Sequence, residues 1–354
     1  MIKKPTLIVS ESICRKNIAK MYSKAIASNT VLRPHFKTHQ NITIGEWYRE
    51  VGISKIAVSS VSMAKMFADQ GWTDILIAFP FNPNEIEEIH NLANHTNLGL
   101  LVSCIDSAEL ASTIVKSSLD IYIKIDVGTH RTGFLPDNIG EISKALEYIS
   151  SNKCLKFRGF VAHAGHTYGS SNHDEIRSIY RIGVGALLKL KKQFSVEFSD
   201  IIISWGDTPS CSIINDFEGV DEIRPGNFVF YDLMQHNINV CKPNEIALIV
   251  ACPVVAKHTD RNEIVIYGGA VHLSKDSILV DGKNVFGLMV RLSNDLSWSF
   301  FEDNVYVDRI SQEHGVIKVS NEIINELAIG DFIGIVPVHS CLTADLVKDF
   351  IFIA

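Results

Sequence analysis

The chain has 354 residues, enough for a large domain plus a smaller one, and its 46% hydrophobic and 21% charged residues are ordinary for a globular protein. A formal net charge of −7 excludes the basic field that draws proteins to nucleic acid or anionic lipid. The sequence has no apolar run of about 18 residues and no signal-peptide pattern, so we expect a cytoplasmic protein without a membrane span, in which the seven scattered cysteines are free thiols.

Short apolar runs alternate with longer amphipathic stretches over the first two-thirds of the chain. Eight strand–helix units predict an α/β fold, a (β/α)8 TIM-like barrel. An open doubly wound sheet is the alternative, but no Gly-rich dinucleotide-binding turn follows the first strand. Asp106 and Ser107 stand where a helix N-cap belongs. Strands are predicted at Val31–Phe36, Lys55–Val58, Asp74–Ala78, Leu98–Ser103, Asp120–Ile125, Phe157–Ala162, Asp200–Ser204 and Asp221–Arg224, and helices at Asn84–His95, Ser107–Lys116, Gly140–Ser150 and His173–Gln193.

The pattern changes after about residue 236, where strand-like runs follow one another with few helical stretches between them. We therefore expect a barrel domain at residues 1–235, of which residues 1–9 could pack with a second domain, and a β-rich domain at residues 236–354. The strands predicted there are Ile246–Ala256, Glu263–Tyr267, Asn304–Ile310, Val316–Val319 and Asp331–Val336.

Reactive side chains collect at or just after the C-terminal ends of the predicted barrel strands. That edge carries the chemistry in barrel enzymes. Because loops are polar in any case, the argument depends on the types of residue found there. They are Lys37, Arg131, His163, His166, Ser204, Asp207, Thr208 and Arg224.

Lys37 lies in RPHFKTHQ, at the end of a predicted buried strand. Burial and the neighbouring Arg33, His35 and His39 would lower its pKa, which favours a Schiff base. A lysine on a surface loop is the alternative.

Two segments, SWGDTPS and RPGN, follow the seventh and eighth predicted strands. Barrel loops at these positions often bind phosphate. The segments offer the Ser204 and Thr208 hydroxyls and the backbone around Gly206 and Gly226, although two ordinary turns would look similar.

The segments DVGTHRTG and HAGHTYG follow the fifth and sixth predicted strands. Arg131, flanked by glycines, could approach a ligand anion or simply lie on the surface. His163 and His166 could bind a metal, or an imidazole could stack on a cofactor ring. In the second domain, His339 and Cys341 are two residues apart, hence on one face of an extended segment, and imidazole with thiolate suits zinc. A surface histidine beside a buried cysteine is the alternative.

Seven segments match one family in order. RPHFKTHQ resembles the pyridoxal 5′-phosphate (PLP) lysine segment of the D-threonine aldolase and D-serine dehydratase group, RPHxKTHK. DVGTHRTG, HAGHTYG, SWGDTPS, EIRPGNFVFYD, SQEHG and PVHSCLT recur in the same family. The resemblance covers nearly the whole chain. It implies an alanine-racemase-like barrel with a β domain, normally a homodimer, which binds PLP and acts on small D-amino acids.

The resemblance also implies roles for single residues. Lys37 would form the Schiff base, Arg131 would lie near the cofactor's phenolic oxygen, and Tyr168 would line the substrate pocket. Arg224 occupies the position of the ring-nitrogen partner in alanine racemase. The implied catalytic set is Lys37, Arg131, Tyr168, His35 and His166, and the implied cofactor-binding set is Lys37, His163, Ser204, Gly206, Asp207, Thr208, Arg224, Gly226 and Asn227.

The implied metal pair distinguishes between activities. His339 and Cys341 would hold a divalent metal close to the substrate's β-hydroxyl; the aldolases usually carry H-x-D, the zinc D-serine dehydratases H-x-C, as here. Thiolate softness favours zinc. We therefore predict a zinc-assisted dehydratase that converts D-serine or D-threonine to an α-keto acid and ammonia. The alternative is a metal-dependent D-threonine aldolase, with His35 or His166 as the base.

Three further interpretations stay open. An amino-acid racemase shares Cα deprotonation but needs no metal. A non-catalytic PLP-binding protein would resemble the barrel alone. A PLP-free metallohydrolase would use His163, His166 and Asp207. Gln40 and Gly268 depart from the family's pattern, so the substrate scope also stays open.

Overall fold

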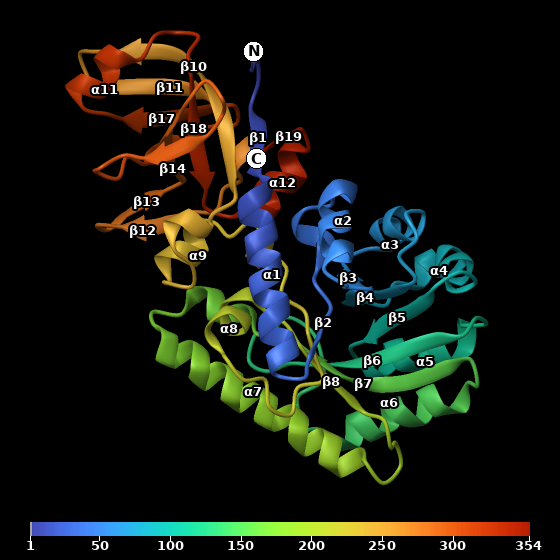
Figure 1. Ribbon diagram of the computed structural model, residues 1–354. Coiled ribbons are helices and arrows are strands. Elements are labelled where there is room, and N and C mark those ends of the chain that lie inside the picture. The colour runs from blue at the N-terminus through green and yellow to red at the C-terminus, as the bar shows by residue number, and fades with distance from the viewer. Residues whose placement is uncertain (1) are drawn as a thin grey trace. The chain divides into compact units, whose positions relative to one another are not determined.

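The computed structural model describes residues 2–354, which form two compact units (Figure 1). One unit runs from Ala19 to Gly226. The other combines the residues up to Ile18 with Asn227–Ala354. The division after Gly226 lies earlier in the chain than the boundary at residue 235 expected from the strand pattern.

The unit from Ala19 to Gly226 contains a parallel eight-stranded sheet in the order β2-β9-β8-β7-β6-β5-β4-β3. Its edge strands also meet, because Ala57 N–H donates to the Pro34 carbonyl at 3.0 Å and His35 forms a parallel bridge with Ala57. The sheet is thus a nearly closed barrel, which confirms the (β/α)8 prediction over the open sheet. The strands are β2 (Val31–Leu32), β3 (Lys55–Val58), β4 (Asp74–Pro80), β5 (Asn97–Val102), β6 (Leu119–Ile125), β7 (Leu155–Ala162), β8 (Ile202–Trp205) and β9 (Glu222–Ile223).

Helices alternate with these strands as the amphipathic pattern predicts. In α7 the apolar residues at helical spacing, such as Ile176 and Leu187, are fully buried, and the Asn172 side chain caps the helix by accepting the Glu175 N–H. The helices are α1 (Glu11–Ala27), α2 (Ile42–Glu50), α3 (Val61–Ala68), α4 (Ile86–Ala93), α5 (Ile105–Ile114), α6 (Ile139–Ser151), α7 (His173–Phe194) and α8 (Thr208–Ile213).

Two local predictions in the barrel were wrong. The first strand ends at Leu32 rather than Phe36, because Pro34 interrupts it and the chain turns into the 3-10 helix η1 (Phe36–Thr38). Helix α5 begins after Cys104, so Asp106 and Ser107 lie in its first turn; the Ser107 hydroxyl instead accepts the Cys104 N–H at 3.2 Å.

The second unit contains a mainly antiparallel sheet that includes the path β15-β14-β18-β10-β11-β17-β16. Strand β1 (Thr6–Ser10), all of whose residues are buried, pairs with β10 on one side and with β19 on the other. The remaining strands are β10 (Leu248–His258), β11 (Glu263–Tyr267), β12 (Ile278–Val280), β13 (Lys283–Val285), β14 (Gly287–Leu292), β15 (Trp298–Phe300), β16 (Val307–Ile310), β17 (His314–Lys318), β18 (Phe332–Pro337) and β19 (Phe350–Ile353), and the helices are α9 (Leu233–Asn237), α10 (Ala270–Leu273), α11 (Asn321–Glu326) and α12 (Ser340–Val347).

Within residues 2–354, none of the helices combines the length and apolar character needed to cross a bilayer.

Candidate active site

Lys37 stands on the short helix η1, directly after the first barrel strand. Phe36 anchors this turn, since its ring packs against Tyr48, Phe67 and Trp72 with centroid distances of 4.8–5.1 Å. The His35 imidazole accepts the Lys37 N–H at 3.4 Å. An aromatic cluster therefore fixes this turn through Phe36, while Lys37 itself is exposed.

Electrostatic effects show that several predicted residues lie near one another. Burial, and then the Lys37 charge, hold the pKa of His35 and of His163 well below the usual range. Arg224 also acts on His35. His163 Nδ1 is hydrogen-bonded to the Gly206 carbonyl. Both imidazoles are therefore neutral at physiological pH, in a site where cations dominate.

A second lysine at this edge was not expected from the sequence. Lys124, at the end of β6, is buried, and its ammonium group donates to the Ile125 carbonyl at 2.7 Å. Burial, followed by the Arg224 charge, lowers the pKa of Lys124 to about 7. A single charged residue within the apolar run IYIKI was the available signal.

The loop after β6 is organised by Asp126. One carboxylate oxygen accepts the N–H groups of Gly128, Thr129 and His130 at 2.9–3.1 Å, and these bonds lower the pKa of Asp126 although burial alone would raise it. Arg131, in this loop, is exposed. The Thr129 hydroxyl lies 3.4 Å from His166 Nδ1, which connects this loop to the one after β7.

Two glycines permit close backbone approach around η1 and Arg224. A Cβ at Gly226 would fall 2.8 Å from the His35 carbonyl oxygen, and one at Gly206 would fall 3.1 Å from Arg224 Nη1. Nearby, the fully buried Thr208 hydroxyl has no hydrogen-bond partner, and the Thr208 N–H donates to the Tyr168 hydroxyl at 3.3 Å.

Two other members of the predicted cofactor-binding set have side chains committed to partners inside the barrel. Asp207 caps α8, accepting the Ser210 N–H at 2.7 Å and the Thr167 hydroxyl at 3.0 Å. Burial raises the pKa of Asp207 to about 6, against the effect of these bonds. The Ser204 hydroxyl donates to Glu222 at 2.6 Å and accepts the Arg224 Nε–H at 2.7 Å.

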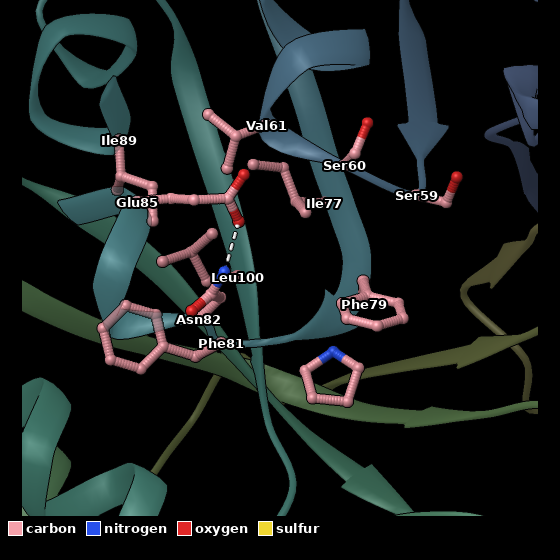
Figure 2. Close-up of a pocket in the computed structure, with 11 residues that line it drawn as sticks. Ser59, Ser60, Val61, Ile77, Phe79, Phe81, Asn82, Glu85, Ile89 and Leu100 are labelled. Carbon is pink, nitrogen blue, oxygen red and sulfur yellow. Dashed lines mark hydrogen bonds between the residues drawn. The ribbon is translucent and has the colours of Figure 1, made fainter. Parts of the chain in front are cut away.

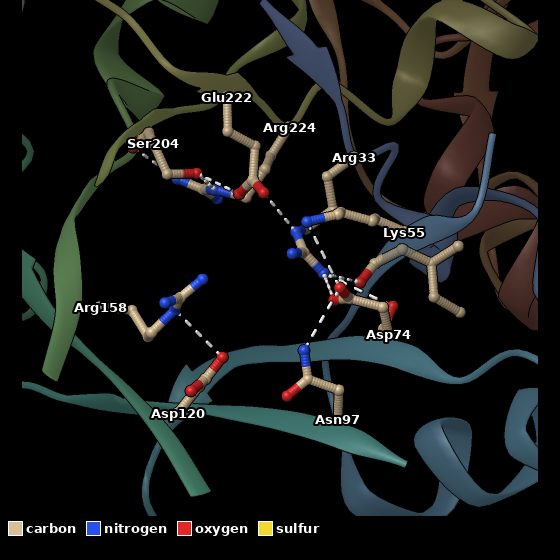
Figure 3. A network of polar contacts seen from close by, with 10 residues as sticks. Arg33, Lys55, Asp74, Asn97, Asp120, Arg158, Ser204, Glu222 and Arg224 are labelled. Atoms are coloured by element: carbon tan, nitrogen blue, oxygen red, sulfur yellow. Dashed lines mark hydrogen bonds and ion pairs between the residues drawn. The ribbon is translucent and has the colours of Figure 1, made fainter. Parts of the chain in front are cut away.

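Ser204 belongs to a polar network that fills this part of the barrel (Figure 3). Arg33 forms ion pairs with Glu222 at 2.6 Å and with Asp74 at 2.7 Å. Sequence reasoning missed Glu222, although its place two residues before Arg224 puts both side chains on one face of an extended segment.

The predicted metal ligands lie in the second unit and differ in local structure from the expectation. His339 is the N-cap of α12 and Cys341 lies in its first turn, so the two do not share an extended segment. His339 Nδ1 is 2.7 Å from the Asp276 carboxylate. Burial alone would lower the pKa of His339, but hydrogen bonds with Asp276 and Cys341 raise it to about 11.

Asn227 also lies in the second unit, beside this pair. Its side-chain nitrogen is 2.6 Å from Asp232, 3.0 Å from the Ser340 hydroxyl and 3.6 Å from the Cys341 sulfur. Asp232 and Asn227 therefore hold the first turn of α12.

Nowhere in residues 2–354 do three or more His, Cys, Asp or Glu side chains gather in a way that suits a metal ion. Among the described residues, His163, His166 and Asp207 form no such group.

A cavity of about 250 Å³ lies beside β4, and none of the predicted site residues lines it (Figure 2). Phe79, Phe81 and Ile89 line it, and Glu85 is bonded to Asn82 across its edge. No lysine, arginine or histidine of the described chain contributes to its wall, so it is a poor candidate for an anionic cofactor.

Comparisons with known proteins match two family models, one to each part of the chain. Residues 9–233 match the family model "Alanine racemase, N-terminal domain", and residues 247–353 match "Putative serine dehydratase domain". A D-serine dehydratase of Dictyostelium discoideum is 29% identical, over 98% of this chain and 92% of its own length.

A D-threo-3-hydroxyaspartate dehydratase of Delftia sp. is 25% identical, over 96% of this chain and 91% of its own. Its solved structure superposes with a TM-score of 0.88, covering 97% of this chain and 92% of that one at 23% identity. A D-threonine aldolase from Filomicrobium marinum gives a TM-score of 0.82 over 98% and 89% of the two chains, at 21% identity.

Proposed function

The chain belongs to the alanine racemase-like family of PLP-dependent enzymes, and we propose that it is a zinc-assisted dehydratase of D-β-hydroxy amino acids, releasing an α-keto acid and ammonia. The similarity to two dehydratases along almost the whole chain supports this class of reaction. We further propose a cytoplasmic homodimer, in keeping with the free cysteines and the family resemblance.

The residues around Lys37 fit PLP. The cofactor needs an amine for its aldehyde and hydrogen-bond donors for its phosphate. Lys37 offers the amine, the unpartnered Thr208 hydroxyl offers a donor, and Gly206 and Gly226 leave room where a Cβ would collide with backbone or side-chain atoms. This arrangement is the observation that carries the proposal.

When bound to Lys37, PLP supplies an electron sink for the pair left behind at Cα. The chain supplies the rest. Once the substrate's amine has displaced it from the cofactor, the Lys37 amine would take the Cα proton. The neutral His163 imidazole, fixed by the Gly206 carbonyl, would offer a flat face to the cofactor ring without adding charge. Arg131 would orient anionic groups from its exposed loop, and Tyr168, tied to Thr208, would line the substrate pocket.

A divalent metal in the second unit would have His339 and Cys341 as its ligands, without a third His, Cys, Asp or Glu ligand among the described residues. A histidine that gives one ring nitrogen to a carboxylate presents the other to a metal, and here Asp276 holds Nδ1 of His339. His339 and Cys341 would hold the metal, zinc by the softness of the thiolate, which would polarise the departing β-hydroxyl. A D-threo-3-hydroxyaspartate dehydratase of this fold has been solved in a form described as metal-free, which is in keeping with a metal-binding member among the relatives.

The proposal is tested by incubating the purified protein with D-serine, D-threonine and D-threo-3-hydroxyaspartate, with the L-enantiomers as controls. We expect α-keto acid and ammonia in equal amounts from at least one D-substrate. Lys37→Ala should lose both turnover and the absorbance of a PLP Schiff base. Retention of both by this variant would refute the assignment.

The alternative is a D-threonine aldolase, which the similar fold of the Filomicrobium enzyme keeps in view. His35 or His166 would then take the β-hydroxyl proton. His166 is the better placed as a base, since it is only partly buried. Burial lowers the pKa of His166, and the charge of Asp126 opposes this lowering. Glycine plus an aldehyde as products, without keto acid, would establish the aldolase.

A further inference from the structure

Four buried side chains in the barrel form a hydrogen-bonded chain that ends at Arg224 (Figure 3). Arg33 binds Glu222 through Nε at 2.6 Å, Glu222 accepts the Ser204 hydroxyl at 2.6 Å, and Ser204 accepts Arg224 Nε–H at 2.7 Å. All four residues are at most 5% exposed. Buried charges are tolerated only when paired, and here each charge has an opposite partner or a hydroxyl that links it to one.

The direction of the bonds in this chain is fixed by chemistry. A carboxylate only accepts, so the single hydroxyl proton of Ser204 must point to Glu222. The Ser204 oxygen is then left with lone pairs for the Arg224 Nε–H. Removing the hydroxyl would remove the acceptor of the Arg224 Nε–H, and removing the carboxylate would leave the Ser204 hydroxyl without the partner that holds it toward Arg224.

Hydrogen bonds hold the Nε and Nη2 edge of the Arg224 guanidinium, and Nη1 lies on the other side. Nη2 donates to the Ala162 carbonyl at 2.7 Å and the Ser204 carbonyl at 3.2 Å. Nη1 lies beside Gly206, where an added Cβ would be 3.1 Å away. Burial lowers the pKa of Arg224 to about 10, and the charge of Glu222 opposes that shift.

We propose that Glu222 is a positioning residue, which acts through Ser204 to fix the Arg224 guanidinium where it would meet the bound cofactor. This inference rests on the proposed function, because it requires PLP at Lys37. Ser204 then serves this chain rather than the phosphate. A purely structural role is the competing explanation, since Arg33 also donates to the Ile56 carbonyl at 3.3 Å and so helps to close the barrel.

The test compares Ser204→Ala, Glu222→Gln and the double variant in PLP titrations of the apoprotein, followed by fluorescence quenching and by the absorbance maximum. Loss of one hydrogen bond should raise the dissociation constant of PLP roughly threefold to tenfold in each single variant. Because both changes break one chain, the double variant should bind no more weakly than the weaker single variant.

Asp120→Asn provides the matched control. Asp120 forms an ion pair with Arg158 at 3.2 Å in the same barrel, and no bond connects it to Arg224 among the residues drawn in Figure 3. Its variant should lose thermal stability while keeping the PLP affinity and spectrum. Unchanged PLP affinity and spectrum in Ser204→Ala, or additive losses in the double variant, would overturn the inference. Failure of the wild-type apoprotein to bind PLP would instead reject the proposed function.

Discussion

Lys124 shows how a single buried side chain couples this site to pH. Its pKa is lowered to about 7 from an ordinary value near 10.5, chiefly by burial. Between these values the unfolded chain binds more protons than the folded one, so folding stability should rise with pH from about 7 to about 10. Below pH 7 Lys124 is charged in the folded protein, and burying that charge lowers folding stability by its full amount. Lys124→Met removes this cost, and we expect it to stabilise the protein at pH 7.5 and to flatten the rise.

Urea unfolding of wild type and variant at pH 7.5 and pH 10 measures this effect. Lys65→Met is the control, because the Lys65 side chain is 66% exposed and pairs only with exposed Asp69. An equal gain in stability from both methionine variants would attribute the effect to added apolar surface and contradict the role of burial.

Asp276 holds Nδ1 of His339 and so fixes the orientation in which the imidazole would meet the metal. Outer-shell carboxylates typically contribute tenfold to a hundredfold to metal affinity. We therefore expect Asp276→Ala to weaken Zn²⁺ binding by roughly that factor, measured by competition with a chromophoric chelator. Asp303→Ala, which removes an exposed carboxylate of the same unit, should leave the affinity unchanged. Equal losses would show that only net charge matters.

For single residues, the sequence indicated the reactive side chains better than the hydrogen-bond partners of those side chains. Lys37 and Arg224 are separated by most of the barrel sequence, and the rule that strand ends converge was enough to group them. The roles of Ser204 and Asp207 could not be predicted, because a hydroxyl or carboxylate in a loop is equally suited to a ligand or to a neighbouring side chain. Asp276 was missed because it is 63 residues from His339.

At the scale of elements, β1 is a short strand that the sequence located only as part of residues 1–9, which could pack with the second domain. It has only five residues, yet it lies between β10 and β19. Ile8 is fully buried, whereas Ile351, its register partner on β19, is 36% exposed. Ile8→Ala should cost about 2–5 kcal/mol of unfolding free energy in urea titrations. Ile351→Ala should cost about 1 kcal/mol or less. Similar costs would mean that β1 is not central to packing.

Regular periodicity made the other elements predictable. Lys55–Val58 and Glu263–Tyr267 were located to the residue, because short runs rich in Ile and Val are followed there by Ser59 and by a pair of glycines. The strands β12 and β13 escaped prediction because three residues carry no measurable period, and α12 was missed because its start was interpreted as an extended segment. The turn of α12 matters most, since it sets the spacing of His339 and Cys341.

At the scale of the whole molecule, the proposed cofactor lysine and metal ligands belong to different units. Each set of residues is held by hydrogen bonds inside its own unit, so PLP and the metal ion should be removable separately. We expect EDTA to abolish keto-acid production while the PLP absorbance persists, and Zn²⁺ to restore activity. In Lys37→Ala the opposite should hold, with Zn²⁺ affinity near that of wild type and no PLP chromophore. Loss of PLP upon chelation would show that the metal also holds the barrel site together, contrary to this assignment.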